Sequence, residues 1–62
     1  MPVVTVEMWA GRTVEQKKAL IADITKAMIT HANVKPTHLH VIIYDVEKEN
    51  WGRGGVIASE LD

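Results

Sequence analysis

The chain begins with a short stretch in which strand-forming residues predominate. Residues 2–9, with the sequence PVVTVEMW, are rich in valine and threonine, which favour β-strands. In an extended strand Val4, Val6 and Met8 would share one face, and the residues between them would share the other. Proline has no backbone N–H and is tolerated mainly at the first residue of a strand or on an edge, so Pro2 fits a strand start. The pattern predicts a strand over residues 2–9.

A helical periodicity follows Gly11. The sequence TVEQ places Thr13 at a helix N-cap and Gln16 three residues later, which matches a capping box. Apolar residues then recur at spacings of three and four, as on one buried stripe of a helix. They are Leu20, Ile21, Ile24, Ala27, Met28 and Ala32. Because Pro36 is a stop signal, the helix is expected to end near Asn33.

A second strand is predicted over residues 38–46, whose sequence HLHVIIYDV is a nearly continuous apolar run. Such runs are typical of buried strands in parallel sheets. The last segment is different, because three glycines surround Arg53 and predict turns, with residues 56–58 able to pair briefly as a strand. The predicted fold class is α/β: a single right-handed βαβ unit with a short C-terminal hairpin or strand.

Size and composition indicate that the chain is stably folded only when it associates with other copies. A chain of 62 residues makes one domain, taken as residues 1–62, and buries only ~60% of its unfolded surface. It is 47% hydrophobic and has no cysteine for a disulfide, and two strands are too little sheet for independent stability. We therefore expect a homo-oligomer in which the sheets of different copies join.

Charge and hydropathy exclude several partners. The net charge is −1 without a charge block, which argues against nucleic acid, and no apolar run approaches the ~18 residues of a membrane span. The lack of cysteine fits the reducing cytoplasm, the expected location.

Pro2 is the first candidate for chemistry. If Met1 is removed, the Pro2 nitrogen becomes a secondary amine that can take and give protons, and burial or a neighbouring cation would lower its pKa toward operating pH. The alternative is that Pro2 only starts a strand.

Other candidates lie in the loops and on the second strand. Arg12, near a helix N-terminus, could bind a carboxylate or be merely solvated. Arg53 and Trp51 could approach a ligand, or form only a glycine-rich turn. His38 and His40, two apart on the predicted strand, would point the same way and could ligate a metal, but a full site would need carboxylates or sharing between subunits. Hydrogen-bonded or interface histidines are therefore favoured, no metal is predicted, and a metal-binding protein stays only as an alternative.

These features together resemble the 4-oxalocrotonate tautomerase family. The resemblance rests on Pro2 behind Met1 and on the runs EMWAGRTVEQKKALI, HVIIYDVEKENWGRGG and ASE, which begin at residues 7, 40 and 58. It implies the tautomerase or MIF-like fold, a hexamer built as a trimer of dimers, and an isomerase without cofactor or metal. The implied reaction is keto–enol tautomerisation of dienol carboxylic acids such as 2-hydroxymuconate, with aromatic catabolism as the expected setting.

The resemblance also implies roles for single residues. Pro2 would be the general base and acid, Arg12 would hold a substrate carboxylate, and Trp51 falls where the family has an aromatic wall, commonly phenylalanine. His40 stands where the well-studied members carry a second arginine, delivered from a neighbouring subunit. Either His40 or Arg53 would then assist at the oxo end of the substrate. Because of this departure, a non-catalytic or promiscuous oligomeric binding module on the same fold is the alternative function.

Overall fold

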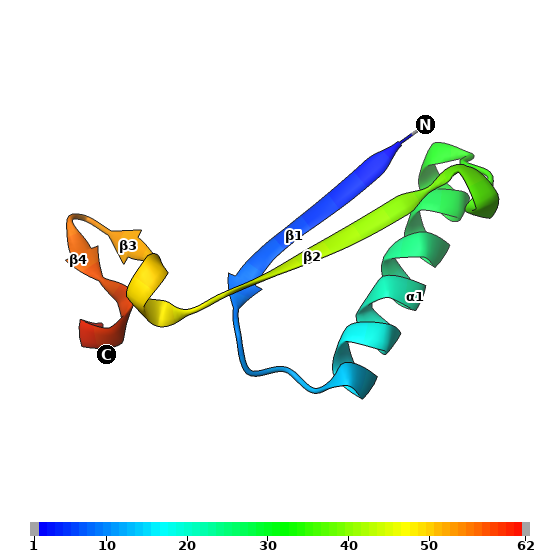
Figure 1. The fold of residues 1–62 in the computed structure, drawn as a ribbon. Coiled ribbons are helices and arrows are strands. Elements are labelled where there is room, and N and C mark those ends of the chain that lie inside the picture. The colour runs from blue at the N-terminus through cyan, green and yellow to red at the C-terminus, as the bar shows by residue number, and fades with distance from the viewer. Residues whose placement is uncertain (1, 62) are drawn as a thin grey trace.

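The fold is a strand–helix–strand unit followed by a small hairpin (Figure 1). The computed structural model describes residues 2–61, so Met1, whose removal is predicted above, lies outside the described residues. Strand β1 (Val3–Trp9) and strand β2 (His40–Val46) pair in parallel, and helix α1 (Val14–Ala32) connects them. The register runs from Val3 opposite His40 to Trp9 opposite Val46. The predicted α/β class and the parallel βαβ unit are confirmed.

Pro2 lies immediately before β1, and the strand itself begins one residue later than predicted. The Pro2 carbonyl accepts a hydrogen bond from the His40 backbone N–H at 3.2 Å. Pro2 therefore enters the ladder through its acceptor, which suits a residue that has no N–H to donate from within a chain.

Helix α1 begins with the predicted capping box. Thr13 Oγ1 accepts from the Gln16 backbone N–H at 3.1 Å, and Gln16 Oε1 accepts from the Thr13 backbone N–H at 2.9 Å. Two donors that the first helical turn leaves unpaired are thereby satisfied. At the other end, the helix stops at Ala32, and Asn33 takes the left-handed conformation with φ 53°.

Removing this cap is expected to destabilise the protein measurably. Thr13→Ala should lower the free energy of unfolding by about 1 kcal/mol, because the Gln16 N–H loses its acceptor. Thermal unfolding at fixed chain concentration would measure the change. Thr30→Ala is the matched control on an exposed position inside the helix, and it should be neutral or slightly stabilising. An equal loss in both variants would contradict the role of the cap.

The second strand starts at His40, so the prediction of a strand from residue 38 is wrong at its first two residues. Pro36–His38 form a 3₁₀ turn, in which the His38 N–H donates to the Lys35 carbonyl at 2.9 Å and the Leu39 N–H to the Pro36 carbonyl at 3.3 Å. Pro36 favours this turn because its φ is already fixed near the helical value. His38 and His40 consequently do not share a strand face.

The glycine-rich tail forms the predicted hairpin. Strands β3 (Gly52–Arg53) and β4 (Val56–Ile57) pair in an antiparallel manner. Gly54 and Gly55 form the two-residue turn with φ of 61° and 82°, a conformation that favours glycine at both positions. Ala58 is not part of the strand, because it begins a 3₁₀ turn and its N–H donates to the Trp51 carbonyl at 2.6 Å.

The helix covers one face of the two-stranded sheet. Val4, Val6 and Met8 of β1 are half-buried on this face, and Lys17 of α1 reaches across to Asp45 of β2, with Nζ and Oδ2 2.5 Å apart. The opposite face, called the open face below, is not covered by the helix. It consists of Val3, Thr5, Glu7 and Trp9 on β1 and of His40, Ile42, Tyr44 and Val46 on β2.

A single copy of the chain has almost no core. Within residues 2–61, Ala58 is the only buried residue, with 1% of its surface exposed. Three large side chains of the open face stay exposed: Val3 at 55%, Ile42 at 40% and Tyr44 at 53%. No helix in this part of the chain is both long and apolar enough to cross a membrane. The uncovered apolar surface is what the expected association with further copies would bury.

Candidate functional site

The five candidate residues fall into two groups at opposite ends of the sheet (Figure 1). Pro2 and His40 lie together where β1 and β2 begin, joined by the hydrogen bond from the His40 N–H to the Pro2 carbonyl. Arg12, Trp51 and Arg53 lie beyond the far ends of the two strands. Because a strand of seven residues spans ~23 Å, one copy of the chain cannot bring Pro2 to Trp51.

The second group is held together by aromatic contacts. Arg12 Nη1 donates a hydrogen bond to the Trp9 carbonyl at 2.8 Å, which fixes the loop that leaves β1. The Trp9 ring meets the Trp51 ring edge to face, with centroids 6.0 Å apart and an interplanar angle of 77°. Lys48 Nζ lies 4.7 Å from the centroid of the Trp9 ring, within the range of a cation–π interaction. Arg12 and Trp51 are thus brought to one end of the sheet through Trp9.

Trp9 is a residue whose part in this group the sequence analysis missed. Its indole Nε1 is buried and has no acceptor among residues 2–61. A buried donor without a partner costs free energy, so an acceptor from outside the single chain would stabilise it. The only sequence signal was its place at the end of a strand, two residues before Gly11.

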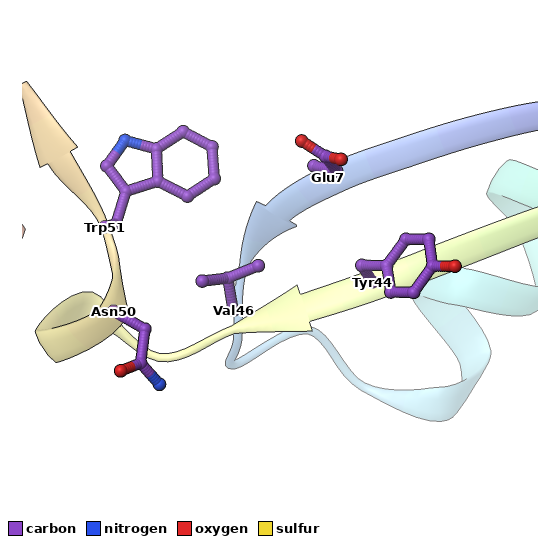
Figure 2. A pocket seen from close by; sticks show the side chains of 5 residues that line it. All are labelled: Glu7, Tyr44, Val46, Asn50 and Trp51. Atoms are coloured by element: carbon purple, nitrogen blue, oxygen red, sulfur yellow. The ribbon is translucent and has the colours of Figure 1, made fainter.

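A cavity of about 320 Å³ lies beside Trp51 on the open face (Figure 2). Glu7 and Tyr44, which are opposite each other in the strand register, form its floor with Val46. Trp51 and Asn50 complete the lining. Figure 2 shows the Trp51 ring extending from its strand end toward the side on which Glu7 lies.

Four of the lining residues were absent from the sequence-based candidates: Glu7, Tyr44, Val46 and Asn50. The alternation of β1 placed Glu7 on the face away from Val4 and Val6. Only the register of a parallel pair sets Tyr44 opposite Glu7, and strand periodicity alone does not supply that register.

The two remaining candidates do not join the cavity. Arg53 lies on β3, next to the glycine turn, with its residue exposed. His40 shares the open face with Tyr44 but is four residues away, or ~13 Å along the strand. Among residues 2–61, no three histidine or acidic side chains are grouped so that they could hold a metal ion.

Comparison with known proteins gives consistent matches over nearly the whole chain. The family model described as "Tautomerase enzyme" matches residues 2–60. A curated relative named 2-hydroxymuconate tautomerase, from Comamonas testosteroni, is 44% identical over 61 residues, which are 98% of this chain and 97% of the relative.

Solved structures show the same similarity. One of the 4-oxalocrotonate tautomerase isozymes from Methylibium petroleiphilum is 43% identical, with a TM-score of 0.89 and 97% of each chain covered. A chain of the heterohexamer 4-oxalocrotonate tautomerase from Chloroflexus aurantiacus is 29% identical, with a TM-score of 0.90 and all of both chains covered. Both similarities extend across the βαβ unit and the hairpin.

Proposed function

This chain belongs to the tautomerase family and is an isomerase of the 4-oxalocrotonate tautomerase type, and from that premise we propose that it interconverts the enol and keto forms of 2-hydroxymuconate-like dienol carboxylic acids, with Pro2 as general base and acid. The observation that carries the proposal is the family match, which starts at Pro2 and includes relatives named for 2-hydroxymuconate. The relatives also favour an enzyme over the binding module considered above.

The proposed reaction needs only proton transfer. Removal of Met1 frees the Pro2 nitrogen, which takes the proton from the enol oxygen and returns it to a carbon of the diene, so that the ketone forms without a net gain or loss of atoms. Arg12 orients a substrate carboxylate through its planar guanidinium. Trp51 walls the site and excludes water, and either His40 or Arg53 assists at the oxo end.

The proposed site is shared between copies of the chain. Pro2 and the pair of Arg12 and Trp51 are at opposite ends of one sheet, so a complete site takes residues from more than one copy. The resemblance implies that the residue at the position of His40 also comes from a neighbouring copy. The near absence of a core in the single chain and the heterohexameric relative support the proposed homo-hexamer. In such an assembly other copies would cover Val3 and Ile42, the exposed apolar residues of the open face that do not line the cavity.

The function is tested by following 2-hydroxymuconate ketonisation by ultraviolet absorbance, with protein whose intact mass shows the loss of Met1. Arg12→Gln is expected to lower kcat/KM by about 10- to 100-fold, mainly through KM, because a charge-assisted pair with the substrate carboxylate is lost. Arg12 also holds the Trp9 carbonyl. Arg12→Lys, which keeps the charge, should therefore recover part of the loss, whereas equal losses in both variants would indicate damage to the loop instead.

A further inference from the structure

We propose that Glu7 makes this enzyme select enol monocarboxylates over dicarboxylates, by placing a negative charge in the cavity beside Trp51. The proposal rests on the function proposed above, since it takes Trp51 to be a wall of the active site. It concerns a second substrate carboxylate, other than the one that Arg12 is proposed to bind.

The cavity places Glu7 and Trp51 against the same space. Both residues line the 320 Å³ volume on the open face, with Val46 between them along the sheet and Tyr44 opposite Glu7 on β2 (Figure 2). A substrate that packs against the Trp51 ring therefore lies within reach of the Glu7 carboxylate. Of the five lining residues, Glu7 is the only one that carries a charge.

No cation within residues 2–61 neutralises Glu7. The one ion pair found in this part of the chain joins Lys17 to Asp45 on the other face of the sheet. Lys48, the nearest lysine in sequence to Trp51, is directed over the Trp9 ring and does not line the cavity. A second substrate carboxylate in this cavity would thus meet a like charge without a cation of this chain beside it.

The residue at position 40 of β2 also disfavours a dicarboxylate substrate. His40 occupies the position where the resemblance implies a second arginine, so the site has one fixed cation fewer for a dianion. Apart from Glu7, the cavity is lined by the uncharged residues Tyr44, Val46, Asn50 and Trp51. This lining suits a substrate whose distal end is uncharged.

A matched pair of substrates tests the proposal. 2-Hydroxymuconate and 2-hydroxypenta-2,4-dienoate have the same dienol and differ by the distal carboxylate. The wild type is expected to prefer the monocarboxylate in kcat/KM, and Glu7→Gln should reduce that preference about ten-fold by improving the reaction of the dicarboxylate. Asp23→Asn, which makes the same change of charge at an exposed position of α1, should leave the preference unchanged.

A second measurement uses the unaltered protein, in case Glu7→Gln fails to assemble. Added salt screens the repulsion between Glu7 and a dianion, so the wild-type preference should shrink as ionic strength rises. Glu7→Asp, which retains the charge, should keep the preference.

The outcomes separate the two proposals. A preference that is unchanged in an assembled Glu7→Gln variant, or a wild type that prefers the dicarboxylate, would overturn the role of Glu7 and leave the tautomerase function intact. Loss of assembly in Glu7→Gln with a salt-independent wild-type preference would instead assign Glu7 to a contact between copies. No reaction with either substrate, in protein lacking Met1, would overturn the proposed substrate class and with it this inference.

Discussion

Replacing Pro2 with alanine is expected to lower kcat/KM for 2-hydroxymuconate ketonisation by about 10²- to 10⁴-fold, the range that a positioned general base contributes. Alanine leaves a primary amine in place of the secondary one, so the lower part of this range applies if that amine takes over some of the proton transfer. The fold should survive, because Pro2 contributes only its carbonyl to the hydrogen bond with His40.

A second variant tests the role of the Pro2 nitrogen while it keeps the proline side chain. Inserting one alanine between Met1 and Pro2 keeps the proline but turns its nitrogen into an amide, which cannot act as a base at neutral pH. This variant should be less active than Pro2→Ala, with circular dichroism and assembly mass as controls for folding. Full activity in the extended protein would show that the base is not Pro2.

Placing a charge on the open face is expected to prevent assembly and folding together. Ile42→Asp puts a carboxylate on β2 beside Thr5, at a position that is 40% exposed in the single chain and that neighbouring copies would cover. Burying that charge without a partner costs several kcal/mol, a large part of the total stability of a small protein. Since a single copy buries only Ala58 among its described residues, the released chain has no core that could keep it folded.

Light scattering measures the loss of assembly, and far-ultraviolet circular dichroism measures the loss of folding. Lys18→Asp is the control, because it adds a carboxylate on an exposed position of α1, away from the open face. It should remain assembled and folded. A folded monomer of Ile42→Asp would contradict the link between assembly and folding, and an intact oligomer would show that the open face is not an interface.

Local sequence patterns predicted most of the fold. The capping box of Thr13 and Gln16 fixed the start of α1, and the apolar run in β2 indicated a parallel partner for β1. These predictions succeeded because caps, periodicity and turn glycines act over a few residues. The start of the second strand was missed, because Pro36 initiates a turn that reaches His38 before the strand begins.

The candidate site could be predicted only in part. Arg12 and Trp51 were expected near a substrate, but their connection through Trp9 depends on how the loop after β1 meets the segment after β2. The cavity beside them depends on the strand register, which sets Glu7 against Tyr44. Such long-range placement is a property of the assembled sheet, and residue spacing along the chain does not encode it directly.

The separation of Pro2 from Trp51 along one sheet has a genetic consequence. In the shared site proposed above, a mutation at either end would damage a site in an adjoining copy, so two chains with defects at opposite ends would restore some working sites when they assemble together. After gene duplication, one chain could therefore lose the Pro2 end and its sister the Trp51 end, with each becoming dependent on the other. A family with a heterohexameric member is one in which such a division of labour can persist.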